Sequence, residues 1–153
     1  ARDSRVPIFM SDTVRIEFYV LPSQEAQARW RTACVLAGKG WRSGLKVFIW
    51  LPNNNDVQAF DQLLWSFRAE AFIPHSCASS ADNTSAPVLL GTHENQGKAC
   101  NLLINLSDQR SQQPERFSRV IEIVDQQPTR LTASREHFKA YRQAGFQPQR
   151  VEL

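Results

Sequence analysis

The sequence predicts a single α/β domain of three layers, in which helices cover both faces of a mostly parallel central sheet. Two observations support this prediction. Apolar strand-like runs alternate with amphipathic helical segments, and the run at 46–51 is apolar at nearly every position, as in strands covered on both faces. With 153 residues, 42% of them hydrophobic and 22% charged, the chain has the size and composition of one globular domain.

The first elements read as a strand, a helix and a second strand. Residues 14–21 alternate and then run apolar, which predicts a strand that ends at Pro22. Apolar residues at helical spacing predict a helix over 23–40, with Ser23 as its N-cap. The strand at 46–51 follows, so a right-handed parallel crossover is expected.

The middle of the chain continues the alternation. Asn55 or Asp56 is expected to cap a helix that leads into an aromatic, extended run at 65–75, and 76–86 reads as an exposed loop. The remaining predicted elements are strands at 88–90, 101–106 and 120–124, a hairpin-like polar stretch at 94–98 between the first two, and a short helix at 114–117.

A helix is predicted over Ser134–Phe146, and its basic residues form a stripe. Arg135, Lys139 and Arg142 follow the i, i+4, i+7 spacing that places them on one face, with Phe138 beside them. Gly145 supplies the residue that can adopt the left-handed conformation and end the helix. Such a surface suits an acidic peptide or phosphate groups.

Many basic stripes are only solvated helix faces, so the distribution of charge matters. From 129 to 150 there are five cations and one acid, a local net charge of +4, whereas the whole chain carries +3. The positive charge is therefore local, which favours a local anionic partner.

Motifs for catalysis and cofactor binding are missing from the sequence. The turn after the first strand, Leu21–Glu25, has no glycine, and no phosphate-loop or dinucleotide fingerprint occurs, so the fold is expected to resemble nucleotide-binding domains without their phosphate loop. His75, Cys77, His93 and Cys100 lack the two tight pairs typical of a zinc site. We expect no metal, no cofactor and no activated thiol.

The N-terminal residues and the cysteines indicate the bounds of the domain and its cellular compartment. Residues 1–9 precede a plausible natural start at Met10, so we assign them to vector-derived residues or an upstream extension and place the domain at 10–153. No signal peptide or membrane span is recognised. Three widely spaced cysteines without a Cys-x-x-Cys motif favour reduced thiols in the cytoplasm.

Three motifs resemble the chi-subunit family of the bacterial DNA polymerase III holoenzyme. They are Trp41-Arg-Ser-Gly44 before a strand, Phe72-Ile-Pro-His75 after a helix, and the long Arg135–Phe146 motif, which is the specific one. The order and spacing fit the family from Val14 to Phe146. The family is not catalytic and links the psi subunit of the clamp loader to the acidic, Phe-terminated tail of single-stranded DNA-binding protein.

The resemblance implies roles for individual residues. The residues that match the family's tail-binding site are Val124, Arg135, Phe138, Lys139, Arg142 and Gly145. Phe138 stands where the family often has Tyr, and Arg130 is the candidate to replace a family cation that falls near Leu131. The psi contact maps to Phe72 and Trp65, although packing in the core is the competing interpretation for Trp65.

The predicted function is therefore a non-catalytic, cytoplasmic replication adaptor with little direct DNA binding. The alternative is a domain that binds single-stranded nucleic acid directly, through the basic helix and stacking aromatic residues. A degenerate nucleotide-binding enzyme is a third possibility, which the glycine-free first turn disfavours.

Overall fold

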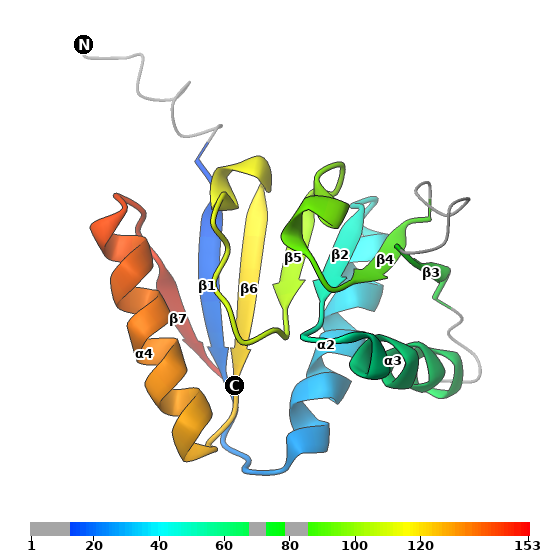
Figure 1. Cartoon of the computed structure of the whole chain (residues 1–153), viewed down its shortest axis with the longest axis horizontal. Helices are drawn as coiled ribbons and strands as arrows, with labels where there is room; N and C mark the ends of the chain where they lie inside the picture. The colour runs from blue at the N-terminus through cyan, green and yellow to red at the C-terminus, as the bar shows by residue number, and fades with distance from the viewer. Residues whose placement is uncertain (1–12, 68–72, 79–85) are drawn as a thin grey trace.

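The computed structural model describes residues 13–67, 73–78 and 86–153, and this part of the chain forms an α/β fold around one seven-stranded sheet. The strand order is β3-β4-β2-β5-β6-β1-β7, and every neighbouring pair is parallel. In Figure 1 the sheet runs from β7 beside α4 to β3 at the other edge. The predicted fold class is confirmed.

The bounds of the elements are as follows. The strands are β1 (Arg15–Val20), β2 (Val47–Trp50), β3 (His75–Cys77), β4 (Val88–Gly91), β5 (Leu102–Asn105), β6 (Arg119–Val124) and β7 (Gln149–Glu152). The α-helices are α2 (Ala26–Arg42), α3 (Asn54–Ser66) and α4 (Pro128–Gln143), and the 3-10 helices are η1 (Glu94–Gly97) and η2 (Pro114–Arg116).

Two apolar clusters, one on each face of the sheet, make up the core. Residues of α2 and α3, such as Ala37 and Phe60, pack in the first cluster. Tyr141 of α4 and Phe117 after η2 pack in the second cluster. The sheet is thus the middle of three layers, and α4 lies on the face opposite to α2 and α3.

The central strands are buried on both faces, as their continuous apolar sequences predict. All four residues of β2, of β4 and of β5 are buried. Parallel sheets in α/β domains carry such runs because helices cover both sides.

The hairpin-like stretch predicted at 94–98 is wrong. β4 and β5 do not pair with each other, because β2 lies between them and pairs in parallel with both. The connection instead forms η1, and a Cβ on Gly97 would lie 2.3 Å from Cγ of Phe48, so only glycine lets this turn lie against the ring. The predicted short helix at 114–117 is confirmed as η2.

The predicted helix caps are wrong by two or three residues. Glu25, not Ser23, occupies the N-cap of α2, and the Ser23 hydroxyl accepts a hydrogen bond from the Glu25 N–H at 2.9 Å. Asn53 caps α3, because its side chain accepts from the Asp56 N–H at 2.8 Å. Ser, Asn and Asp side chains near a helix start can each bond to nearby backbone N–H groups, so the capping residue is hard to predict.

The C-terminal helix is longer than predicted, and a strand follows it. α4 begins at Pro128, a residue favoured in the first turn, and Gly145 has φ +98° just beyond its end. β7 then pairs with β1 and forms the edge of the sheet. Its polar sequence gave no strand signal.

Two further predictions concern the ends and the membrane. The assignment of residues 1–9 falls outside the described residues. Among the helices that the structure describes, none is both long and apolar enough to cross a bilayer.

Candidate functional site

A groove of about 570 Å³ lies between α4 and the neighbouring strands β6, β1 and β7. Its lining residues are Phe18, Val20, Val124, Ser134, Arg135, Phe138, Lys139, Arg142, Gln143 and Arg150. It combines an apolar floor with a rim of positive charge.

The floor of the groove is apolar because of the strand register. Val20 of β1 is aligned with Val124 of β6, and both side chains are buried. Phe18, two residues before Val20, therefore points to the same face, where its ring meets Phe138 of α4 with centroids 5.2 Å apart. This floor offers an aromatic or aliphatic side chain a surface on which to be buried.

The rim of the groove is basic. Arg135, Lys139 and Arg142 are all exposed, and none forms an ion pair with any other residue in the described ranges. Arg150 of β7 contributes a fourth cation, which pairs with Glu152. Three cations without a counter-charge make the rim attractive to carboxylates, which Arg binds in bidentate fashion.

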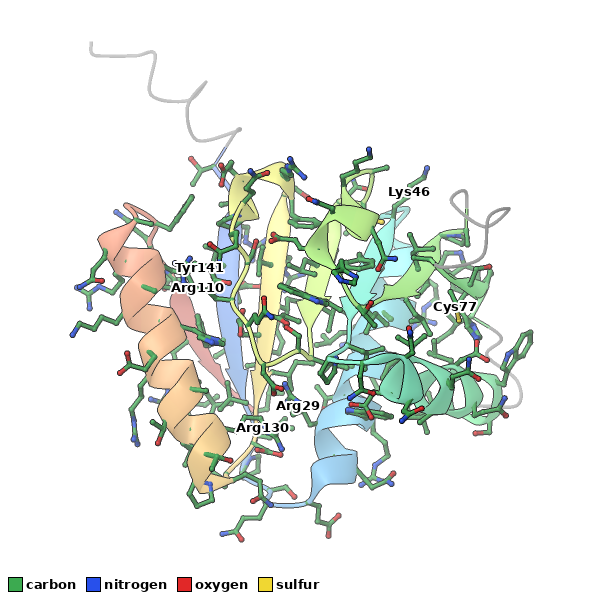
Figure 2. All side chains as sticks on the ribbon, in the orientation of Figure 1. Arg29, Lys46, Cys77, Arg110, Arg130 and Tyr141 are labelled. Atoms are coloured by element: carbon green, nitrogen blue, oxygen red, sulfur yellow. The ribbon has the colours of Figure 1, made fainter. Side chains whose placement is uncertain are left out.

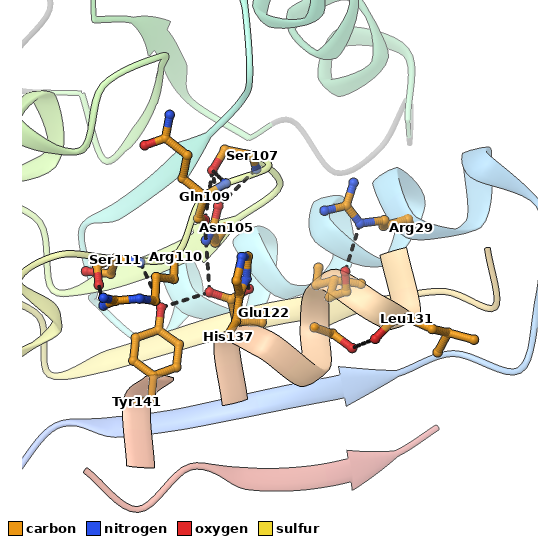
Figure 3. Close-up of polar contacts among 12 residues, drawn as sticks. Arg29, Asn105, Ser107, Gln109, Arg110, Ser111, Glu122, Leu131, His137 and Tyr141 are labelled. Atoms are coloured by element: carbon orange, nitrogen blue, oxygen red, sulfur yellow. Dashed lines mark hydrogen bonds and ion pairs between the residues drawn. The ribbon is translucent and has the colours of Figure 1, made fainter. Parts of the chain in front are cut away.

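A buried polar network fixes α4 against the sheet (Figure 3). The Tyr141 hydroxyl donates to Oε2 of Glu122 at 3.0 Å and accepts from the Ser111 N–H at 2.8 Å. Asn105 also donates to Oε2 of Glu122, at 2.9 Å, and His137 lies 3.4 Å from Oε1. Burial, and then the nearby charge of Glu122, raise the pKa of Tyr141 far above its usual value, so the phenol stays protonated as a donor.

A second polar group lies at the carboxyl edge of the sheet, between α2 and α4 (Figure 2). Arg29 donates from Nε to the Ile123 carbonyl at 2.8 Å, and Arg130 donates to the buried Asp125 carboxylate at 2.8 Å. Burial, and then the charge of Arg130, lower the pKa of Arg29 to about 10. These contacts anchor the start of α4 and the end of β6.

The groove gathers five of the six residues that the sequence assigns to tail binding. Val124, Arg135, Phe138, Lys139 and Arg142 all line it. Gly145 does not, because it follows the helix and lines a neighbouring cavity of about 600 Å³ with Phe146. Arg130 is also absent from the groove, since its guanidinium is paired with Asp125.

Sequence reasoning did not assign five of the ten lining residues to the site, namely Phe18, Val20, Ser134, Gln143 and Arg150. Phe18 and Val20 were read only as strand residues, although their alternation already placed them on one face of the sheet. Arg150 belongs to the strand that was not predicted, so no signal brought it next to the helix.

Comparison with known proteins identifies the family. The family model of the DNA polymerase III chi subunit, HolC, matches residues 14–149. The chain belongs to the DNA polymerase III chi-subunit family. The predicted resemblance is thereby confirmed.

Three bacterial relatives named DNA polymerase III subunit chi extend this result. The one from Pseudomonas aeruginosa is 42% identical over 132 residues, which cover 86% of this chain and 92% of that protein. The one from Escherichia coli is 31% identical (74% and 78% covered), and that from Haemophilus influenzae is 29% identical (85% and 91% covered). A solved structure of the C-terminal domain of the DEAD-box protein Dbp5 matches with a TM-score of 0.31 at 16% identity, covering 96% of this chain and 80% of that one. This TM-score is too low to indicate a shared fold.

In this family member the turn after β1 is tied down by hydrogen bonds. The Ser23 carbonyl accepts from the Gln126 N–H at 2.9 Å, and Nε2 of Gln126 donates to the Leu21 carbonyl at 2.8 Å. Gln127 likewise donates to the Gln24 carbonyl at 2.8 Å. The turn thus contacts the segment after β6 through its carbonyl groups.

The three cysteines are free thiols, and two of them are buried. Burial raises the pKa of Cys34 to about 12 and that of Cys100 to about 11, so both are poor nucleophiles at neutral pH. Cys77 is half-buried, and burial also raises its pKa. The described residues contain no group of three or more His, Cys, Asp or Glu side chains that could hold a metal ion.

A second candidate surface lies at the opposite end of the sheet, near the edge strand β3. Trp65 at the end of α3 is 55% exposed, so it does not pack in the core as the competing interpretation required. Its ring meets His75 with centroids 4.9 Å apart, and Nε2 of His75 lies 2.9 Å from Oδ1 of Asp61. Phe72, the other residue assigned to psi binding, lies outside the described residues.

Proposed function

We propose that this protein is a non-catalytic, cytoplasmic adaptor in DNA replication that links the psi subunit of the clamp loader to the acidic C-terminal tail of single-stranded DNA-binding protein. Membership of the chi-subunit family supports the general setting. The groove beneath α4 supports the tail as one partner. The proposal needs neither a cofactor nor a metal.

The observation that carries the proposal is the combination of an apolar floor and unpaired cations in one groove. Phe18, Val20 and Val124 supply the floor, and Arg135, Lys139 and Arg142 stand along the rim. A tail that ends in Phe after several Asp residues has the complementary chemistry. Its ring would be buried on the floor, and its carboxylates, including the terminal one, would pair with the rim.

The second partner is assigned to the surface around Trp65. An exposed Trp beside an edge strand is a typical hot-spot residue of a protein interface. Strands β3 and β7 form the two ends of the sheet, so this surface and the groove lie at opposite ends of the molecule. Such an arrangement lets psi and the tail bind at the same time, as an adaptor requires.

Direct binding of single-stranded DNA is the competing function. It would use the basic rim for phosphates and exposed aromatic rings for base stacking. Yet Trp65 belongs to α3, on the other face of the sheet from α4, and Phe138 beside the rim is half-buried against Phe18. The exposed Trp65 ring and the basic rim therefore do not share one surface, which favours the peptide.

A salt titration separates the two functions. Fluorescence anisotropy is measured with a labelled acidic, Phe-terminated peptide and with a labelled single-stranded oligonucleotide, from low to high salt. We expect peptide binding that weakens with salt but persists, because burial of the ring is insensitive to screening. Oligonucleotide binding that is tighter than peptide binding, with a steep log-linear loss in salt, would contradict the proposal.

A further inference from the structure

We propose that Arg150 of β7 forms a second basic wall of the groove, and that Glu152 holds its guanidinium until the carboxylates of an acidic peptide displace it. This inference rests on the proposed tail binding. It adds a contact on the strand side of the groove and an internal competitor for that contact.

The sheet register places both residues on the groove side. Arg150 is aligned with Phe18 of β1, and Glu152 is aligned with Val20. Aligned residues of parallel neighbours point to the same face, and Phe18 and Val20 form the groove floor. Arg150 therefore lies across the floor from Arg142 and its neighbours on α4, and it lines the groove itself.

Arg150 is paired with Glu152 but can still bind a carboxylate of a ligand, because the ion pair is exposed. Its Nε donates to Oε2 of Glu152, two residues along the same strand. The side chains are 65% and 66% exposed, so water screens this ion pair and makes it weak. A carboxylate arriving from a bound peptide can replace Glu152 without any change in the fold.

The consequence is a groove with two basic walls and one removable acid. Arg135, Lys139 and Arg142 have no ion-pair partner among the described residues, whereas Arg150 carries its own. Binding of an acidic chain at Arg150 then includes the release of Glu152. Removing the Glu152 charge should tighten binding, and removing Arg150 should weaken it.

The test uses fluorescence anisotropy with a labelled peptide of several Asp residues ending in Phe. The variants are Arg150→Gln, Glu152→Gln and the double substitution, with Arg142→Gln as the reference for the proposed site and Arg42→Gln, an exposed residue of α2 on the other face, as the matched control. Arg150→Lys retains the charge and guards against an effect on β7 pairing, and thermal unfolding confirms that each variant is folded.

We expect Arg150→Gln to weaken binding about fivefold and Glu152→Gln to tighten it about two- to threefold, in keeping with exposed ion pairs. The double variant should match Arg150→Gln, because Glu152 acts only through Arg150. Arg150→Lys should retain most of the affinity, and Arg42→Gln should retain all of it.

Three outcomes would overturn the inference, and they are distinguishable. If Arg142→Gln weakens binding while Arg150→Gln does not, the tail site stands and the second wall is wrong. If the wild-type protein does not bind the peptide, or Arg142→Gln has no effect, the proposed function itself fails. If Glu152→Gln tightens peptide binding equally in the wild-type protein and in Arg150→Gln, Glu152 does not act as a competitor for Arg150.

Discussion

Phe18 of β1 and Phe138 of α4 pack with ring centroids 5.2 Å apart and planes inclined by 56°. This contact joins the buried sheet to the half-buried side of the helix that carries the basic rim. It therefore sets the distance between the apolar floor and the cations. In the proposed function, the tail must match this distance with its terminal ring and its carboxylates.

Replacing Phe138 by Ala should weaken tail binding about tenfold or more, because the groove loses its aromatic wall. The stability cost should stay below the roughly 3–5 kcal/mol typical of a fully buried Phe, since Phe138 is only half-buried. Peptide anisotropy and urea unfolding measure the two effects. Phe138→Leu is the matched control and should retain most of the peptide affinity and of the stability. An equal loss of affinity in the Ala and Leu variants would argue against a specific role of the ring.

Replacing Tyr141 by Phe should destabilise the protein by about 1–3 kcal/mol, because the buried Glu122 carboxylate and Ser111 N–H each lose a partner. Tyr19→Phe is the control. Its hydroxyl accepts from Arg119 in a half-buried setting, so its loss should cost less. Urea unfolding of both variants gives the comparison, and a Tyr141 effect no larger than that of Tyr19 would mean that the network does not anchor α4.

Stability should fall at alkaline pH in part through Cys34. Burial raises the pKa of its thiol from 9.0 to about 12, so above pH 9 the unfolded chain loses this proton while the folded protein keeps it. The contribution of Cys34 is thus complete below pH 9 and is lost as the pH rises towards 12. Cys34→Ala should flatten the decline by up to about 1.4 kcal/mol per pH unit.

Chemical denaturation from pH 7 to 11 measures this slope rather than the absolute stability, which Cys34→Ala also changes through packing. Cys77→Ala serves as the comparison, since that thiol is only half-buried. An unchanged slope in Cys34→Ala would show that the thiol ionises equally in both states.

Replacing Trp65 by Ala should abolish or strongly weaken psi binding with little loss of stability, because the side chain is largely exposed. Surface plasmon resonance with immobilised psi measures the binding, and thermal unfolding measures the stability. Binding of the tail peptide provides an internal control, since the groove lies at the other end of the sheet. A large stability loss with psi binding intact would assign Trp65 a structural role instead.

The central fold followed directly from the sequence, and the reason lies in burial. Strands such as β2 and β5 are apolar at successive positions because helices cover both faces, and that pattern is easily read. The basic stripe on α4 was equally predictable, since helical periodicity alone brings Arg135, Lys139 and Arg142 together. The rim of the groove was therefore predictable.

The edge of the sheet was not predictable in the same way. β7 has the sequence Gln-Arg-Val-Glu and is mostly exposed, so only its pairing with β1 makes it a strand. Arg150 and the apolar floor beneath α4 depend on that pairing and on the register of β1 with β6. Pairing between segments that are distant in the sequence produces no periodic pattern from which it could be predicted.

The most direct test of the tail site is isothermal titration calorimetry with two acidic peptides that differ only by the terminal Phe, each titrated into wild-type protein and into Arg142→Glu. We expect the complete peptide to bind wild-type protein at least about tenfold more tightly than the shortened one, with a more negative heat-capacity change from burial of the ring. Arg142→Glu should weaken the complete peptide by a similar factor. Equal affinity for the two peptides, or unchanged affinity in Arg142→Glu, would contradict the account.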